Sequence, residues 1–172
     1  MAPLTLAQQQ TLKTFILNDA TLSTKASGEG TDLGFIANAL NAAASPDFWS
    51  WKSLLSKIDA VSATSPDATT FSWTAYIARS QAERDAWAQI WNSTLSVNPS
   101  LDSVRSAFAD IFSGANGAAT RTHLLAMARR LSTLAEKLLA TGTGSTGSPA
   151  KFGWEGAITI TGPNGVQAIL AS

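Results

Sequence analysis

The sequence contains no cysteine, and this absence excludes several kinds of chemistry. Without a thiol the chain forms no disulfide, offers no thiolate nucleophile and binds no metal through cysteine ligands. His123 is the only histidine. One histidine with scattered carboxylates does not match the ligand pattern of a zinc site. We therefore expect neither a metal nor any other cofactor.

Catalytic motifs are lacking as well. A catalytic histidine needs a nucleophile and an orienting carboxylate beside it, and no motif places them near His123. The Gly-x-Gly segments 28–30 and 142–144 lack the lysine and the strand–turn–helix context of a phosphate-binding loop. We predict that the chain is not an enzyme. The alternative is a small helical enzyme or regulatory binding module, which would require a concave site with perturbed ionisable groups.

Charged side chains are scarce, at 14% of the chain, against roughly 25% in a typical soluble domain. Twelve basic residues balance twelve acidic ones, so no net charge attracts nucleic acid or an anionic membrane. Such a surface is suited to being covered by neighbouring subunits. Arg129 and Arg130 add positive charge to a predicted long helix. They would either face packaged DNA non-specifically, near a DNA channel, or lie on a solvated face with local ion pairs.

Long apolar runs are also missing. No stretch of about 18 apolar residues occurs, which predicts no transmembrane helix and no membrane partner. The start of the sequence, MAPLTLAQQQ, lacks the basic residues and the long apolar run of a secretory signal.

A helical pattern is present in a chain of 172 residues, 45% of them hydrophobic, which is long enough to bury a core. The stretch 100–140 predicts a long αα-hairpin with a Ser/Gly/Asn turn at 113–117 and a second arm from about 120 to 140. The first arm has the apolar residues Leu101, Val104, Phe108, Ile111 and Phe112, and the second has the stripe Leu124, Ala128, Leu131, Ala135 and Leu138.

Further helices are predicted before the hairpin. Residues 5–18 and 31–41 have apolar residues at helical spacing. A third helix of about a dozen residues follows Pro46, because proline is favourable in a first helical turn. Ser80 starts another helix with the spacing of a capping box. Residues 71–77 fit a strand and a short helix equally well, since their aromatic residues alternate.

The chain changes character after residue 140. Residues 141–150 form a Gly/Ser/Thr linker, and 151–172 alternate like a β-strand or hairpin, although 166–170 also fit one helical turn. Because a lone hairpin is marginal in water, we predict that this arm pairs with a neighbouring subunit by strand addition. The predicted inter-subunit contacts are Phe152, Trp154, Ile158, Ile160, Val166 and Ile169.

The predicted fold class is therefore mainly α, with a helical bundle domain at 1–140, the linker at 141–150 and the C-terminal β arm at 151–172. The chain has six tryptophans. Most are expected to fill the core, because large aromatics contribute much of a core's burial and no basic patch accompanies them for nucleic-acid stacking. Trp154 lies beyond the linker and suits an interface equally well.

Four segments share an unusual mixture of aromatic, small and basic residues. They are 43–52 (AASPDFWSWK), 71–74 (FSWT), 119–130 (ATRTHLLAMARR) and 152–156 (FGWEG), the last after a Gly/Thr tract. These segments resemble a family of small tailed-bacteriophage proteins, mostly described as hypothetical, and the similarity covers about Leu4 to Gly156. The motifs carry no chemistry, so the resemblance transfers no catalytic residue.

This resemblance implies a non-enzymatic structural component of the virion. In general plan the chain is similar to head–tail connectors or adaptors, which are small helical bundles forming a ring beneath the portal. The implied partners are further copies of the chain in a ring of about twelve, by analogy with the portal, the phage portal protein, and tail or neck proteins. The implied location is the head–tail junction of the virion, after synthesis in the host bacterial cytoplasm. A tail-completion (terminator) or capsid-decorating protein is the alternative.

Overall fold

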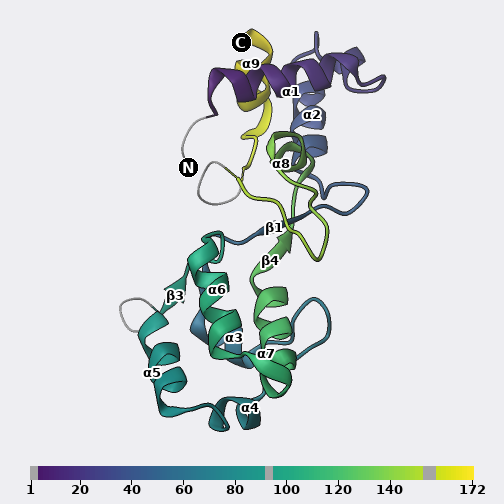
Figure 1. Cartoon of the computed structure of the whole chain (residues 1–172). Coiled ribbons are helices and arrows are strands. Elements are labelled where there is room, and N and C mark those ends of the chain that lie inside the picture. Colours follow the sequence, from purple (N-terminus) through teal and green to yellow (C-terminus); the bar gives the residue numbers. More distant parts are fainter. Residues whose placement is uncertain (1–3, 92–94, 153–157) are drawn as a thin grey trace. The chain divides into compact units, whose positions relative to one another are not determined.

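The computed structural model describes residues 4–91, 95–152 and 158–172, and most of its regular structure is helical (Figure 1). The prediction of a mainly α fold is confirmed. Among the described residues, no helix has the length and hydrophobicity needed to cross a bilayer.

The chain divides into two compact units. Unit 1 comprises residues 1–50 and 131–172, and unit 2 comprises residues 51–130. The structure thus divides the chain differently from the predicted bundle at 1–140 with a separate arm, because the C-terminal residues belong to the same unit as the first fifty.

Unit 1 is built mainly from helices. A capping box begins α1, in which the Thr5 side chain and the Gln8 side chain each accept a bond from the other's backbone amide. Helix α9 packs against α1 and α2, so the end of the chain lies beside its beginning. The bounds are α1 Leu6–Asn18, η1 Ser23–Lys25 (a 3-10 helix), α2 Thr31–Asn41, α8 Leu134–Leu139 and α9 Gly162–Ala171.

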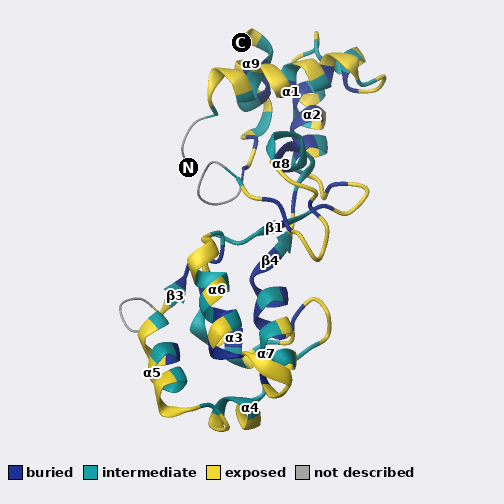
Figure 2. Cartoon of the chain, in the orientation of Figure 1, coloured by how far each residue is buried: buried dark blue, intermediate teal, exposed yellow. Residues whose placement is uncertain are grey.

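The core of unit 1 is aliphatic, and the buried sides of its helices are visible in Figure 2. Both ends of the chain contribute to it, because residues from α1 and α2 pack there with residues from α8 and α9. Its buried members are Leu12, Ile16, Leu22, Leu33, Ile36, Ala37, Leu40, Ala135, Ile158, Ile160, Val166 and Ile169.

Unit 2 has an aromatic core between short helices. Its buried aromatic residues are Phe71, Trp87, Trp91, Phe108 and Phe112. The bounds are β2 Leu55–Ser56, α3 Lys57–Ser62, α4 Trp73–Ile77, α5 Gln81–Ile90, β3 Ser96–Val97, α6 Asp102–Ile111 and α7 Gly114–Met127. Strands β2 and β3 pair antiparallel, with Leu55 opposite Val97. Strands β1 (Trp49–Trp51) and β4 (Arg129–Leu131) form a second two-stranded sheet, and the division between the units falls within each of them.

The predicted αα-hairpin is correct in its first half and wrong in its second. Helices α6 and α7 pack against each other, but α7 begins at Gly114, inside the predicted turn. A Cβ atom on Gly117 would lie 2.3 Å from the Phe112 carbonyl oxygen, so this glycine permits a close approach of two helices. The second arm is not one helix over 120–140, because α7 ends at Met127 and β4 precedes α8.

The helix predicted after Pro46 is also wrong. Residues 49–51 form strand β1, whose alternation buries Ser50 between two partly exposed tryptophans. The Ser132 hydroxyl donates to the Ser50 hydroxyl at 2.9 Å, so a buried polar pair accompanies the strand. At 71–77, where the sequence left two alternatives, the structure has helix α4 with Ser72 as its N-cap.

The C-terminal β arm is not formed in the described residues. Residues 162–171 are helix α9, with Pro163 in its first turn, and residues 158–161 belong to no strand. The predicted linker is part of unit 1 and contacts its residues Phe48 and Trp49. The Trp49 amide donates to the Gly144 carbonyl at 2.7 Å, and Gly144 lies so close to the Phe48 ring that a Cβ atom would clash with it.

Candidate interaction surface

Most of the predicted inter-subunit contact residues lie inside unit 1. Ile158, Ile160, Val166 and Ile169 are each at most 5% exposed and belong to its aliphatic core. Their apolar surface is therefore covered by the chain's own helices, and contact with a neighbour would require them to leave the core. Phe152 is half-buried. Trp154 lies outside the described residues.

Backbone groups of this C-terminal segment are also hydrogen-bonded within unit 1. The Asn41 side chain donates to the Ile160 carbonyl at 2.9 Å and accepts from the Ile160 amide at 2.8 Å. The buried Glu136 carboxylate accepts from the Ile158 amide at 2.9 Å and from the Thr133 amide at 2.9 Å. These bonds occupy backbone groups that strand addition to another subunit would need.

The predicted DNA-facing arginines do not form an open cationic surface. Arg129 is 8% exposed, and its guanidinium forms an ion pair with Asp67 within unit 2. Arg130 is partly buried in strand β4. The charge of Arg129 is thus already balanced inside the unit, which favours a structural role for it.

His123 is buried within unit 2 and binds backbone groups. Its Nε2 atom lies 2.9 Å from the Ala60 carbonyl oxygen, and its Nδ1 atom lies 3.0 Å from the Thr69 carbonyl oxygen. The ring therefore joins α3 and the following loop to α7. Both ring nitrogens are thus within hydrogen-bond distance of backbone oxygens. This geometry makes His123 a structural residue of the unit.

Burial perturbs the ionisation of two basic side chains in unit 2. It lowers the pKa of Lys52, while the charge of Asp59 acts to raise this pKa and the charge of Arg130 acts to lower it. Burial also lowers the pKa of Arg105, whose guanidinium stacks 4.5 Å from the centre of the Trp51 ring. Among the described residues, no group of three or more His, Cys, Asp or Glu side chains is placed to hold a metal ion.

An open groove of about 310 Å³ lies beside strand β3 in unit 2. This volume is at the lower end of the range of roughly 300–1,000 Å³ for small-molecule sites. The groove is lined by Ile90, Ser96, Val97, Asn98, Ser103, Val104 and Ala107. None of these side chains is charged, so the groove offers no acid, base or ion-pair partner to a substrate.

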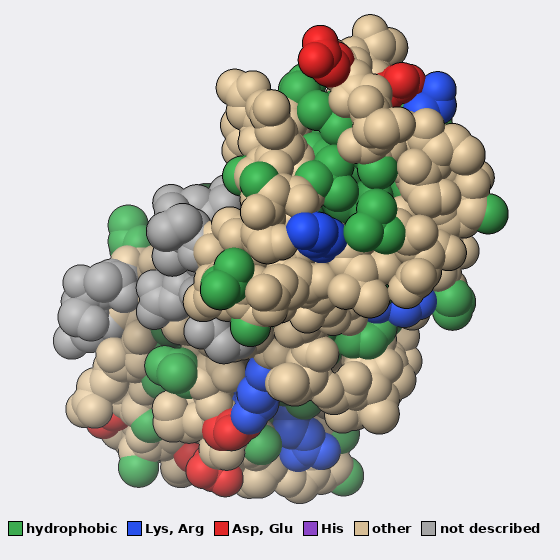
Figure 3. Space-filling view, turned by 90° about the horizontal axis from the view of Figure 1, so that it is seen from above, with side chains coloured by type: hydrophobic (Ala, Val, Ile, Leu, Met, Phe, Trp, Pro, Cys, Tyr) green, Lys and Arg blue, Asp and Glu red, His purple; other side chains and the backbone are tan. Residues whose placement is uncertain are grey.

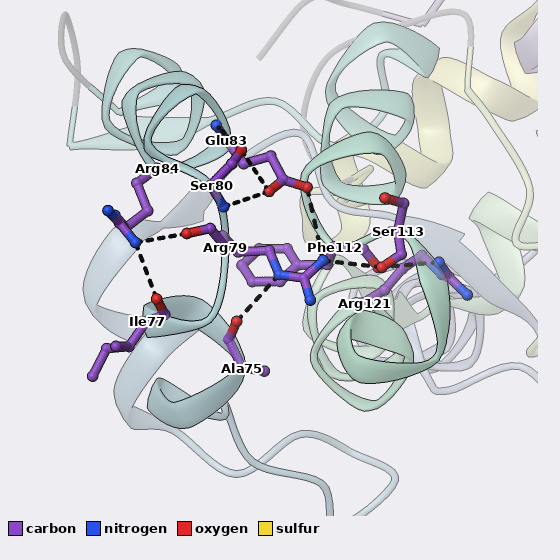
Figure 4. A network of polar contacts seen from close by, with 9 residues as sticks. All are labelled: Ala75, Ile77, Arg79, Ser80, Glu83, Arg84, Phe112, Ser113 and Arg121. Atoms are coloured by element: carbon purple, nitrogen blue, oxygen red, sulfur yellow. Dashed lines mark hydrogen bonds and ion pairs between the residues drawn. The ribbon is translucent and has the colours of Figure 1, made fainter.

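A network of arginines fixes the connection between α4 and α5 (Figure 4). Arg79 donates to the carbonyl oxygens of Ala75, at 3.2 Å, and Ser113, at 3.0 Å. Arg121 donates to the Phe112 carbonyl at 3.1 Å, so two cations lie at the C-terminal end of α6, where the helix dipole favours positive charge. Ser80 caps α5, and its hydroxyl and amide lower the pKa of the Glu83 carboxyl by hydrogen bonding.

Helix α4 presents an uncharged apolar surface beside this network. We call it the α4 patch and define it as Trp73, Thr74, Ile77 and Ala78, all of which are exposed. Figure 4 shows the Ile77 side chain pointing away from the network while its carbonyl accepts a bond from Arg84. Trp73 is 52% exposed and Ile77 is 69% exposed. Sequence reasoning missed this surface, because it assigned Trp73 to the core.

Other large hydrophobic side chains are exposed on both units. In unit 1 the surface of α1 includes Leu6 and Leu17, and that of α2 includes Phe35. In unit 2, Leu54, Ile58 and Leu95 are 66%, 70% and 81% exposed. Figure 3, a view from above, shows hydrophobic side chains at the surface and charged ones in a few separate groups.

Comparison of the chain with protein-family models, with curated proteins and with solved structures finds no match in any of the three.

Proposed function

We propose that the chain is a non-enzymatic structural component of a tailed-phage virion, acting as a head–tail connector subunit in a ring docked on the portal. The resemblance of its sequence segments to small phage proteins suggests the class of particle. The observation that carries the proposal is the exposure of large hydrophobic side chains on both units of a chain with few charges.

Exposed apolar patches on a folded protein mark surfaces that a partner covers. In a cyclic ring each subunit presents two different faces to its two neighbours. A chain whose described residues expose such side chains on two separate units suits this arrangement. A third kind of contact, with the portal, would use further exposed residues such as Leu54, Ile58 and Leu95 in unit 2.

The interior of the described part of the chain favours assembly over catalysis. Its histidine is occupied by backbone carbonyls, and its groove is lined by uncharged side chains. Lys52, whose pKa burial lowers, is partly buried beside Arg130 and Asp59. None of these groups pairs a nucleophile with a general base in the manner that catalysis requires.

The test is the native mass of the purified chain, alone and mixed with the portal ring encoded by the same genome. We expect the chain to join the portal in a fixed ring stoichiometry, measured by native mass spectrometry and by electron microscopy of the complex. A tail-tube or capsid preparation from the same phage serves as the matched comparison. Binding to one of these and not to the portal would replace the connector proposal with a tail-completion or capsid-decorating one.

A further inference from the structure

We propose that unit 1 of one copy is completed by the C-terminal segment of a second copy, through exchange of residues 158–172. This inference rests on the proposed function only in assuming that the chain assembles with itself. In the structure the segment closes unit 1 of its own chain, where α9 packs against α1 and α2. We call the sides of α1, α2 and α8 that face the aliphatic core the acceptor surface. In the exchanged form this surface receives the segment of a neighbour.

The fit between the segment and the acceptor surface is visible within one chain. Ile158, Ile160, Val166 and Ile169 are each at most 5% exposed and share one aliphatic cluster with residues of α1, α2 and α8. Leu170 packs against the same cluster. Obligate subunit interfaces resemble a domain core cut in half, and a contact made by this segment has that character.

Hydrogen bonds add specificity to this fit. Asn41 of α2 bonds both the amide and the carbonyl of Ile160, at 2.8 and 2.9 Å. Glu136 of α8 accepts from the Ile158 amide at 2.9 Å. Two helices of the acceptor surface thus bind defined backbone groups of the segment, which fixes the register in which any copy of the segment docks.

The segment also has contacts of its own. The Gly162 amide donates to the Ile160 carbonyl at 3.0 Å, and the Gly165 amide donates to the Thr161 carbonyl at 3.0 Å. A Cβ atom on Gly165 would lie 3.3 Å from the Ile160 Cγ2 atom, so the Ile160 side chain packs on the first turn of α9. These contacts stay the same whichever copy receives the segment. Exchange therefore changes only the chain that supplies the segment, which is why domain swapping is a low-cost route to assembly.

The connection to the rest of the chain decides between the closed and the exchanged form. Phe152 and Ile158 are six residues apart, and an extended chain covers about 20 Å over that distance. Two exchanging copies must therefore have their acceptor surfaces close together. A short tether holds the segment near its own acceptor surface at an effective concentration on the order of 1 mM. We expect closed monomers in dilute solution and exchange where copies are crowded, as in a ring.

In a ring each copy gives its segment to one neighbour and receives a segment from the other. Such a contact is heterologous, because the segment and the acceptor surface are different parts of the chain. A closed ring has as many segments as acceptor surfaces, so no apolar surface is left uncovered. The exchange places the predicted inter-subunit residues Ile158, Ile160, Val166 and Ile169 at the subunit contact, with helix packing in place of strand addition.

The first experiment uses the absence of cysteine from the sequence. Lys13 and Ser172 are close, because the Lys13 ammonium donates to the Ser172 carbonyl at 2.5 Å. A full-length chain with Lys13→Cys and Ser172→Cys thus has one thiol on α1 and one on the segment, which a short bis-maleimide can join. The chain is unfolded in urea and refolded at concentrations up to about 1 mM. We expect cross-links within single chains in dilute samples and a ladder of joined chains in concentrated ones, resolved by denaturing electrophoresis.

A mixture of the two single variants isolates exchange between copies. When Lys13→Cys and Ser172→Cys chains are refolded together, these two positions can be joined only between chains. We expect at least about tenfold more product of doubled mass than from a control mixture of Gln89→Cys and Ser172→Cys, since docking raises the local concentration of the two thiols. Gln89 is exposed on α5, outside the acceptor surface. Cross-links confined to single chains at every concentration, or a mixture that matches the control, overturn the inference.

A second pair of variants tests the segment by its effect on folding. Val166→Asp puts a charge on the fully buried side of the segment, and Ile36→Asp puts one in the acceptor surface. We expect each variant alone to lose hydrogen-exchange protection in unit 1. In a mixture the intact segment of the Ile36→Asp chain can dock on the intact acceptor surface of the Val166→Asp chain.

The readout is NMR of the mixture at about 1 mM, with only the Val166→Asp chain isotopically labelled. We expect the amides of α1 and α2 in this chain to regain protection. Labelled and unlabelled Val166→Asp chains mixed with each other are the control and should show no recovery. A mixture of the two different variants that also shows none overturns the inference.

These outcomes separate the inference from the proposed function. If the double-cysteine chain joins the portal in a complete ring and still cross-links only within single chains, the connector role stands and the exchange is wrong. If concentrated chains exchange their segments but ignore the portal, the exchange stands and the connector role is wrong.

Discussion

The two units differ in the side chains that form their cores and in the parts of the chain that supply them. Unit 1 packs aliphatic side chains from both ends of the chain, with Leu12 and Ile16 in α1 meeting Val166 and Ile169 in α9. Unit 2 packs aromatic rings from one continuous segment, residues 51–130. Because closing a long loop costs conformational entropy before any contact forms, unit 1 depends on long-range pairing in a way that unit 2 does not.

The two units also differ in their basic residues. Every arginine of the chain lies in unit 2, and every basic residue of unit 1 is a lysine. Arg79, Arg84 and Arg121 each donate to backbone carbonyls where short helices end. The planar guanidinium suits this task, because it presents several donors in a fixed geometry. In unit 2, arginine side chains thus connect short helices by hydrogen bonds to the carbonyls at their ends.

The largest effect is expected from deleting residues 158–172. The deletion removes α9 and four residues of the unit 1 core. We expect unit 1 to lose its fold while unit 2 keeps its own, because no residue of 51–130 is removed. Hydrogen exchange measured by NMR would then show amides of α1 and α2 exposed and those of α6 and α7 still protected.

The isolated segment 51–130 is the control for this deletion. It should show the same protected amides in α6 and α7 as the full chain. Loss of protection throughout both proteins would mean that the two units fold only together.

The second largest effect is expected from Phe112→Ala. Phe112 is fully buried, and its ring lies 5.4 Å from Trp87 and 5.9 Å from Phe71. We expect the free energy of unfolding of unit 2 to fall by about 3–5 kcal/mol, because the lost ring leaves a cavity among rigid neighbours. Urea unfolding followed by tryptophan fluorescence measures it. Phe35→Ala, at a position 47% exposed in unit 1, should leave this transition unchanged.

Local sequence patterns, namely capping residues and apolar residues at helical spacing, predicted α1 and α2 correctly. Helix α2 has the expected bounds, and α1 begins one residue after the Thr5 cap. The break inside the predicted long helix was also encoded locally, because Thr133 and Glu136 form a capping box. The continuous apolar stripe at 124–138 obscured that signal, since a stripe persists when a helix stops and restarts.

The features that sequence reasoning missed depend on distant contacts. Ile158 and Ile160 alternate like strand residues, but they fill the core of unit 1 instead of pairing with another strand. Phe71 and Trp73 are two residues apart, yet one is 7% exposed and the other 52%. Their local patterns are alike, so only the packing of α4 on its neighbours separates a core residue from a surface one.

A smaller effect is expected from Asn41→Ala in unit 1. The Asn41 amide bonds both the carbonyl and the amide of Ile160, which ties α2 to the C-terminal segment. Its removal leaves the partly buried Ile160 amide without this acceptor, whereas the Ile160 carbonyl still accepts from the Gly162 amide at 3.0 Å. We expect a loss of about 1–3 kcal/mol. Chemical unfolding followed by exchange at α9 amides measures it. Asn38→Ala, an exposed change on the same helix, should stay within about 0.5 kcal/mol of the unmodified chain.

The smallest effect is expected from Ser80→Ala in unit 2, and it should depend on pH. The Ser80 hydroxyl and amide donate to the Glu83 carboxylate at 2.8 and 2.7 Å, and they hold the pKa of Glu83 below its ordinary value. A lowered pKa in the folded state means that this contribution is present above the unfolded pKa of about 4.3 and is lost as the pH falls through the folded value.

At neutral pH we expect Ser80→Ala to destabilise unit 2 by about 0.5–2 kcal/mol, the usual cost of losing an N-cap. The difference should shrink as the pH falls through the lowered pKa of Glu83 in the folded state, where the carboxylate becomes protonated. Ser106→Ala, an exposed change in the interior of α6, is the control and should show no such pH dependence. A difference that stays constant from neutral to acidic pH would assign the effect to the hydroxyl–backbone bond alone, without the carboxylate.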